Sequence, residues 1–341
     1  MKLLSVVVPS YNAEKYLDRS IPSLVVCGNE VEVIIVNDGS KDNTLQIARA
    51  YEEKYPDIIR VIDKENGGHG SGINAALEVA TGLYFKCCDA DDWFEEKAFK
   101  SFMEIIKKHY EEGKSPDLYL TDFVYNRADE GKTHCHNCHK TYPINKFVTW
   151  EDFKAPNNED FFMMHMFTYK LEILKKSKLH LPEHTFYVDN LYVYQPLYYV
   201  KTMYYHPVGL YQYYVGHADQ SINYENMAKN YKHAMRVYKC VFSAYTLDEL
   251  NKLSKAHRKY MLFSIVVIEA LTVFYSVLAP KQGSKKEYKA LRKEYKATNR
   301  ALYKKIQWGT RFIISNLLIP GIKDICIKIG YKIVKKKTGW Y

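Results

Sequence analysis

The 341-residue chain has a formal net charge of +10, with 49 Lys and Arg against 39 Asp and Glu residues. This charge favours acidic partners such as nucleotides, phospholipid or anionic polymers, but the sequence contains no recognisable RNA- or DNA-binding module, so we expect no nucleic-acid partner. Seven cysteines without a repeating framework indicate a reducing compartment, and the amino terminus does not read as a signal peptide, so we expect a cytoplasmic protein.

Strand and helix patterns alternate along the first hundred residues. Each short, β-branched apolar run is followed by a turn and then by a stretch with helical spacing, which predicts a mostly parallel, Rossmann-like α/β sheet. Neither GxGxxG after the first strand nor GxxxxGK[ST] is present, so the sequence supports neither a dinucleotide fingerprint nor a P-loop. The predicted strands are 3–8, 31–36, 58–62 and a run from 83, and the predicted helices are 13–24, 42–54 and 71–80.

The stretch LYFKCCDADDWF, residues 83–94, ends an apolar run in the carboxylates Asp89, Asp91 and Asp92. In open α/β sheets, ligands bind beyond the carboxyl ends of the strands. Asp89 and Asp91 can face one small volume, where Mn²⁺ or Mg²⁺ carrying phosphate oxygens would relieve their repulsion. The alternative is a solvated acidic loop, with Asp92 as the N-cap of a helix predicted over 95–113.

The other strand ends also carry groups that suit a nucleotide. Tyr11 offers a flat face for a base, and Asp38 can accept hydrogen bonds from a base or ribose. The glycine run at 67–70 allows backbone to approach a ligand closely.

Three segments, VVVPSYNAEKYLDRSI, VEVIIVNDGSKDNT and KENGGHGSGINAALEVATGLYFKCCDADDW, resemble in order and spacing the family 2 glycosyltransferases with the GT-A fold. HMFTYK (165–170) and EHTFYVDNLYVY (183–194) resemble the acceptor-side part of bacterial members that build surface polysaccharides. The resemblance implies a GT-A domain over 1–225, with a nucleotide-sugar-binding half (1–115) and an acceptor-side half (116–225). A basic, helical region over 226–341 would follow.

The resemblance also implies site residues. Asp89-Ala90-Asp91 takes the place of the DxD motif, with Asp91 favoured over Asp89 as the direct metal ligand. The family often has Asp where this chain has Asn37, and Ser or Thr where it has Ala90, but neither change removes an expected ligand. The residues implied for the nucleotide-sugar, usually a uridine-linked one, are Pro9, Tyr11, Asn12, Asp38, Asn66, Gly68, His69, Asn74, Asp89, Ala90 and Asp91.

Asp189, in FYVDNLYVY, matches the position at which the family places its catalytic acid. It follows an apparently strand-like run, and desolvation among apolar neighbours would raise its pKa, as suits a base that deprotonates an acceptor hydroxyl. The alternatives are a helix cap at Asp189 and Asp92 as the base. The family implies an inverting rather than a retaining mechanism.

The middle of the chain holds weaker candidates. The run HCHNCH, residues 134–139, has zinc-ligand spacing but no second pair, so we interpret it as a polar hairpin tip after a strand at 117–125. His165 and His217 are expected to contact the donor or acceptor sugar, the phosphate or the metal, against the alternatives of a core histidine and an ordinary turn. The tyrosine-rich stretch 192–214 is interpreted as an aromatic strand pair.

The carboxyl-terminal third is predicted to be helical. Residues 260–279 are apolar enough for a membrane span, but the acid Glu269 at their centre favours a buried helix of a bundle. Basic amphipathic helices predicted over 281–305 and 312–334, with Trp340 and Tyr341 at the end, suit peripheral contact with the anionic inner face of a membrane. The sequence leaves open whether these helices pack on their own domain or in a homo-oligomer.

These features predict a metal-dependent, inverting glycosyltransferase that uses a nucleotide-sugar, a UDP-sugar by preference, and a glycan or polyprenyl-linked acceptor. The alternative is a catalytically silent nucleotide-sugar or glycan-binding protein on the same fold. The presence of both Asp91 and Asp189 favours the enzyme.

Overall fold

The computed structural model describes residues 1–127, 131–139, 141–152, 162–215, 224–279 and 284–307. The chain divides into two compact units, residues 1–214 and 215–341. His217 and the predicted helix 312–334 lie outside the described residues.

Unit 1 is built on a ten-stranded sheet of order β3-β2-β1-β4-β9-β6-β10-β5, with β7 on β6 and β8 on β10. The first four of these strands pair in parallel, β9 is antiparallel to both β4 and β6, and β6 is parallel to β10. This confirms the predicted mixed, mostly parallel α/β class. The strands are β1 Leu4–Ser10, β2 Val31–Asp38, β3 Ile59–Lys64, β4 Tyr84–Cys87, β5 Trp93–Phe94, β6 Leu118–Arg127, β7 Lys132–His136, β8 Phe147–Val148, β9 Phe167–Lys170 and β10 Met203–Tyr214.

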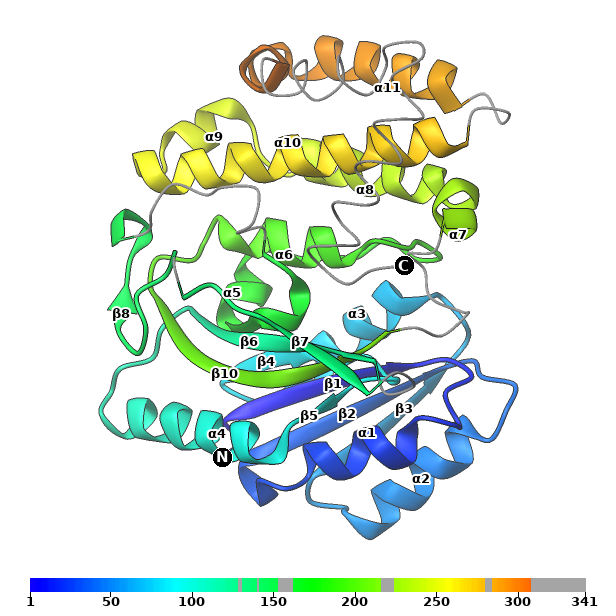
Figure 1. Cartoon of the computed structure of the whole chain (residues 1–341), viewed down its shortest axis with the longest axis vertical. Helices are drawn as coiled ribbons and strands as arrows, with labels where there is room; N and C mark the ends of the chain where they lie inside the picture. Colours follow the sequence, from blue (N-terminus) through cyan, green and yellow to red (C-terminus); the bar gives the residue numbers. More distant parts are fainter. Residues whose placement is uncertain (128–130, 140, 153–161, 216–223, 280–283, 308–341) are drawn as a thin grey trace. The chain divides into compact units, whose positions relative to one another are not determined.

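Helices cover both faces of this sheet (Figure 1). One face carries α1, α2 and α4, and the other carries α3, α5 and α6. Every residue of β1 and β2 is buried, which agrees with the apolar stretches Val6–Val8 and Val33–Val36 at the centres of these strands. The helices are α1 Leu17–Leu24, α2 Thr44–Lys54, α3 His69–Val79, α4 Glu96–Glu111, α5 Leu171–Lys176 and α6 Asp189–Leu197, with 3₁₀ turns at Gly28–Glu30, Trp150–Asp152 and Met164–Met166.

Two predictions about turns in unit 1 are wrong. The N-cap of α4 is Glu95, whose side chain accepts the N–H of Ala98 at 2.7 Å, whereas Asp92 is buried and points inward. The HCHNCH run is not a hairpin tip, because its first residues lie in β7, paired with β6. Cys138 is also buried, and its N–H donates to the Tyr205 hydroxyl at 3.1 Å.

The predicted strand at the start of the tyrosine-rich stretch is also wrong. Tyr192 and Tyr194 belong to α6, and only β10 is a strand. Residues 183–188, directly before Asp189, do not form a strand either. Most of α6 is buried, on more than one side, so its sequence has no amphipathic period from which a helix could be predicted.

The described residues of unit 2 are mostly helical, as predicted. The acid at the centre of its long helix, Glu269, is 2% exposed, accepts a hydrogen bond from Tyr288 at 2.7 Å and lies 3.7 Å from Arg292 Nε. The predicted helix 281–305 is interrupted at Asn299, after which residues 300–307 are helical again. The named helices are α7 Tyr224–Lys229, α8 Tyr231–Ser243, α9 Leu247–Asn251, α10 Lys255–Leu278 and α11 Ser284–Thr298.

Among the described helices, α10 alone is long and apolar enough to cross a membrane by length and composition. However, 61% of its most apolar window is buried inside the structure. That burial and the internal partners of Glu269 agree with a core helix of the bundle.

Candidate active site

Asp38, at the end of β2, organises the first part of the site. Its buried carboxylate accepts hydrogen bonds from the N–H groups of Gly67 (2.9 Å) and Gly68 (2.6 Å) and from Lys64 Nζ (2.9 Å). Asn66 Nδ2 donates to the Asp38 side chain at 3.1 Å and to its carbonyl oxygen at 2.8 Å. The end of β2 and the turn that leads into α3 are therefore held together.

Pro9, Tyr11 and Asn12 lie at the end of the neighbouring strand. Pro9 is buried within β1, whereas the Tyr11 side chain is 53% exposed. Asn12 has a φ of +50°, and its Oδ1 accepts the Lys41 N–H at 2.8 Å. Because β1 and β2 are parallel, Tyr11 and Asp38 are at the same edge of the sheet, as the sequence predicted.

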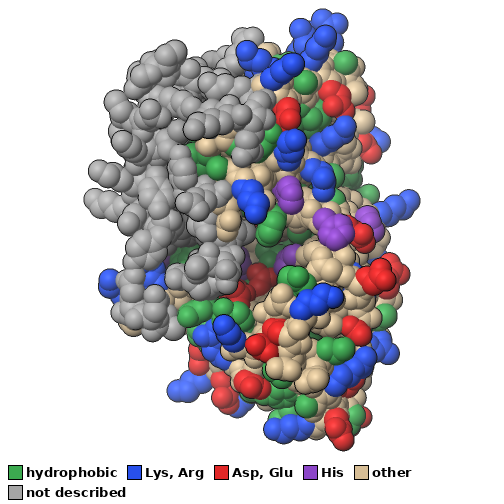
Figure 2. All heavy atoms as spheres, turned by 90° about the vertical axis from the view of Figure 1, so that its right-hand side faces the viewer, with side chains coloured by type: hydrophobic (Ala, Val, Ile, Leu, Met, Phe, Trp, Pro, Cys, Tyr) green, Lys and Arg blue, Asp and Glu red, His purple; other side chains and the backbone are tan. Residues whose placement is uncertain are grey.

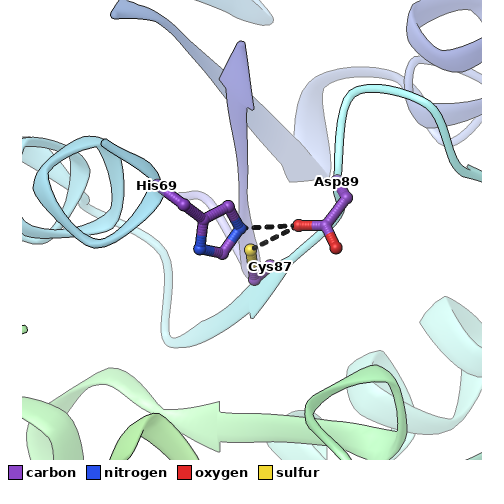
Figure 3. Close-up of side chains that lie close together, drawn as sticks. All are labelled: His69, Cys87 and Asp89. Atoms are coloured by element: carbon purple, nitrogen blue, oxygen red, sulfur yellow. Dashed lines mark hydrogen bonds and ion pairs between the residues drawn. The ribbon is translucent and has the colours of Figure 1, made fainter. Parts of the chain in front are cut away.

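His69, the first residue of α3, is the positive centre of the site (Figure 3). Its Nε2 lies 2.7 Å from Asp89 Oδ1, and the Cys87 thiol donates to the same oxygen at 3.9 Å. Burial alone would lower the pKa of His69, but the charges of Asp89, Asp189 and Asp91 raise it above its ordinary value. Burial alone would likewise raise the pKa of Asp89, but His69 lowers it. The two groups form an ion pair.

Two groups of possible metal ligands share Asp89. The first consists of His69, Cys87 and Asp89, and the second consists of Asp89, Asp92 and His165. Within each group, one ligand atom from each residue lies within 4.8 Å of the others. Among the described residues, Asp91 belongs to neither group.

Two members of the second group, Asp89 and His165, suit a divalent cation. His165 Nδ1 is buried and has no hydrogen-bond partner in the described part of the chain. Burial lowers the pKa of His165 to about 4, so its imidazole is neutral, which is the form that binds metal. Carboxylate oxygens with one imidazole suit Mn²⁺, and the oxygens also suit Mg²⁺.

Asp92 ties the acidic loop to β10. Its fully buried carboxylate accepts the Tyr211 hydroxyl at 2.6 Å and the Tyr214 N–H at 2.7 Å. The Tyr211 hydroxyl in turn accepts the Asp89 N–H at 3.0 Å. Burial, with added repulsion from Asp91 and Asp89, raises the pKa of Asp92 well above its usual range. The side chain is therefore already engaged within the fold.

Arg19 of α1 holds the other side of this loop. Its Nη2 donates to the Asp91 carbonyl oxygen at 2.6 Å, and its guanidinium lies over the rings of Trp93 (4.2 Å) and Tyr214 (4.4 Å). Ala90, between the two acids, is buried. Arg19 could not be predicted from the sequence, because its partners are more than seventy residues away.

Asp189 is the first residue of α6 and is half-buried. The N-cap of α6 is Val188, so Asp189 is not the helix cap that the sequence offered as an alternative. Burial raises the pKa of Asp189, Asp89 adds to this effect, and His69 opposes it. The raised pKa agrees with the predicted desolvation.

Lys86 was missed by the sequence reasoning, although a lysine within the apolar run LYFKCC is itself a signal. It is fully buried in β4, and its Nζ donates to the carbonyl oxygens of His165 (2.8 Å) and Phe167 (3.1 Å). Burial lowers its pKa to about 7. Lys86 thus fixes the backbone that carries His165 behind the acidic loop.

Comparison with known proteins identifies the family. The model of "Glycosyl transferase family 2" matches residues 5–177, about half of the chain. The chain belongs to glycosyl transferase family 2. The matched region contains every predicted nucleotide-sugar residue and His165, and it ends before Asp189.

Curated relatives include a teichoic acid biosynthesis protein and a poly(ribitol-phosphate) glycosyltransferase. The chain is 31% identical over 157 residues to the minor teichoic acid biosynthesis protein GgaB of Bacillus subtilis, covering 45% of this chain and 17% of GgaB. It is 34% identical over 113 residues to the poly(ribitol-phosphate) beta-N-acetylglucosaminyltransferase TarS of Staphylococcus aureus, covering 32% of this chain and 20% of TarS. The chain thus spans only a minor part of the length of these relatives.

Solved structures agree on the fold. Residues 1–349 of S. aureus TarS in complex with UDP-GlcNAc superimpose with a TM-score of 0.61 at 18% identity, covering 100% of this chain and 93% of that one. The unliganded form of the same TarS fragment gives a TM-score of 0.60. At this identity the likeness shows the fold alone, and it agrees with the predicted GT-A type.

Proposed function

We propose that the chain is a metal-dependent, inverting glycosyltransferase that transfers a sugar from a UDP-sugar to a glycan or polyprenyl-linked acceptor in cell-surface polysaccharide synthesis. The observation that carries the proposal is the contact of His69 Nε2 with Asp89 Oδ1 at 2.7 Å, which joins the acids after β4 to the glycine turn that binds Asp38. The charges of Asp91 and Asp189 also raise the pKa of His69. Family membership and the names of GgaB and TarS support the reaction and its setting.

The donor would bind at the carboxyl ends of β1, β2 and β4. The exposed ring of Tyr11 would stack on the base, and the Asp38–Asn66 pair would contact the nucleoside beside it. The UDP-GlcNAc in the TarS complex supports a uridine nucleotide.

Asp89 and His165, whose ligand atoms lie within 4.8 Å of each other, would hold the Mn²⁺ or Mg²⁺, together with Asp91 of the same acidic loop. Such an ion supplies positive charge that stabilises a departing diphosphate. The ion pair of His69 and Asp89 places a protein cation at the same acids, and Lys86 fixes the backbone at His165.

Asp189 would take the proton of the acceptor hydroxyl while that oxygen attacks the anomeric carbon from the side opposite the leaving UDP. This single displacement inverts the configuration of the sugar. The raised pKa of Asp189 suits this role, because a base is most effective when its pKa is near the working pH.

The proposal is tested by UDP release from a panel of nucleotide-sugars, including UDP-GlcNAc, in Mn²⁺, Mg²⁺ or EDTA. We expect release from one or two donors that depends on the metal and is lost in Asp91→Ala. Asp189→Asn should bind UDP normally and lose transfer. No release from any donor, together with no UDP binding by calorimetry, would overturn the proposal.

We also propose that the chain is cytoplasmic and contacts the anionic inner face of the membrane through α11. Figure 2 shows Lys and Arg side chains gathered at the top of the molecule, where α11 lies in Figure 1. Helical spacing places four exposed lysines on one stripe of α11, opposite its buried tyrosines. The stripe consists of Lys286, Lys289, Lys293 and Lys296, and the buried residues are Tyr288 and Tyr295.

The acids of α11 do not neutralise this stripe. Glu287 accepts the Tyr231 hydroxyl at 2.8 Å and lies 3.4 Å from Lys232 Nζ. Glu294 pairs with Lys239 at 2.6 Å. Both acids are thus paired with α8, and by helical spacing they lie off the lysine stripe, which supports a cationic stripe on α11.

A further inference from the structure

Asn74 is bound to a distant segment that leads to Asp189. Its Nδ2 donates to the Leu181 carbonyl oxygen at 2.8 Å, and its Oδ1 accepts the Leu181 N–H at 2.9 Å. One side chain thus satisfies both backbone groups of Leu181. We call residues 181–188 the strap, because they connect this anchored point to Asp189 at the start of α6.

The glycine run before α3 admits the strap. The Gly67 carbonyl oxygen accepts the His184 N–H at 2.6 Å, and Gly68 has a φ of +84°. A Cβ at Gly68 would lie 3.2 Å from the His184 nitrogen. A Cβ at Gly70 would lie 2.8 Å from Leu181 Cβ and 3.2 Å from the Pro182 carbonyl oxygen. The backbone that lies close to these glycines is therefore the strap, a segment of the same chain.

The strap has a conformation that needs external support. His184 and Tyr187 have φ values of +45° and +67°, in the left-handed region that non-glycine residues seldom adopt. Such residues persist only where surrounding contacts determine them. The hydrogen bonds of Asn74 and Gly67 are such contacts, and they hold the end of the strap that is farther from Asp189.

The turn and the first helical residues of α3 that anchor the strap, together residues 67–74, also hold the donor side of the site. Gly67 and Gly68 donate to Asp38, and His69 pairs with Asp89. We propose that Asn74 is a positioning residue for transfer, which fastens the strap to this turn and so fixes Asp189 relative to the donor. The inference rests on the proposed function, and it gives Asn74 a role different from lining the nucleoside pocket.

Asn74→Ala is the principal test. Because a displacement of about 1 Å in a reacting group can cost about 100-fold in rate, we expect kcat for transfer to fall by about 10- to 100-fold. Transfer should fall by at least about tenfold more than the slow release of UDP without acceptor, since that release does not need the base. Asn74→Asp keeps the acceptor for the Leu181 N–H and should recover part of the loss.

Gly70→Ala tests the same contact from the opposite direction. Its methyl group would displace the strap at Leu181 without removing a hydrogen bond. We expect the same signature as for Asn74→Ala, with transfer reduced more than acceptor-independent release.

Gln195→Ala is the matched control. Gln195 is also an amide side chain that binds backbone in this part of the chain: it lies on α6, and its Nε2 donates to the carbonyl oxygen of Ser177, which is outside both residues 67–74 and the strap, at 2.8 Å. It should lower thermal stability and leave the ratio of transfer to acceptor-independent release unchanged.

Hydrogen–deuterium exchange separates the anchor from the chemistry. We expect faster exchange over residues 181–184 in Asn74→Ala and Gly70→Ala, and not in Gln195→Ala. Unchanged exchange there would overturn the anchoring whatever the activity. Faster exchange with transfer and acceptor-independent release reduced equally would overturn the positioning role alone. If the wild-type chain is inactive and binds no UDP, both the proposed function and this inference are overturned.

Discussion

Asp189 is a residue whose environment predicts the pH dependence of transfer. Burial and Asp89 raise its pKa, and a base must be deprotonated to act. We therefore expect kcat/KM for transfer to fall as the pH falls through the raised pKa, so that the acidic limb lies above the ordinary value of 3.8. A pH–rate profile measures this limb. A limb at or below the ordinary value would contradict a desolvated base.

Lys86 predicts a pH dependence of stability. Its pKa is about 7 in the folded chain and about 10.5 when unfolded, so between these values the unfolded chain binds the extra proton and stability rises with pH. Below about pH 7 both states hold the proton and the destabilisation is complete. Lys86→Met should flatten the rise in the free energy of unfolding by up to about 1.4 kcal/mol per pH unit. Urea unfolding from pH 7 to 9.5 checks this, and equal slopes would contradict it.

The junction of β2 with the loop before β4 depends on one buried acid. Glu32 accepts hydrogen bonds from the Ser5 hydroxyl and from the N–H groups of Thr81 (2.5 Å) and Gly82 (2.9 Å). Glu32→Ala removes the acceptor of the buried Ser5 hydroxyl and of the Thr81 N–H, whereas the Gly82 N–H keeps Ser5 Oγ, so we expect a loss of about 2 kcal/mol in the free energy of unfolding, measured by urea denaturation.

Glu30→Ala is the control for this element. Glu30 pairs with Lys107 at 2.7 Å on the surface, where removal of an ion pair costs less than about 1 kcal/mol. Equal losses in the two variants would show that the buried acid has no special role.

Elements differ in how much of them the sequence could predict. β1, β2 and the acids after β4 were predictable, because fully buried parallel strands are apolar runs and polar groups collect at their ends. α6 was not, because burial on more than one side removes its period. The bond between Asn74 and Leu181 joins residues 107 positions apart, so no local pattern indicates it.

For the whole molecule, the cationic stripe of α11 predicts binding to anionic vesicles. Each lysine near such a surface contributes about 1 kcal/mol, so changing Lys286, Lys289, Lys293 and Lys296 to Ser should weaken binding at least about tenfold. Sedimentation with vesicles that contain anionic or only neutral lipid measures this. Serine at four exposed lysines of unit 1, Lys97, Lys108, Lys175 and Lys201, removes the same charge and should have a smaller effect. Equal effects would contradict a specific surface.

The contact between residues 67–74 and the strap has a consequence for chimaeric proteins. A hybrid that takes its donor half from one relative and its acceptor half from another would join a turn and a strap that were not selected together. Such hybrids should recover transfer only when both segments come from the same parent. Exchange of donor preference between relatives is therefore expected to require residues 67–74 and 181–188 to move as a pair.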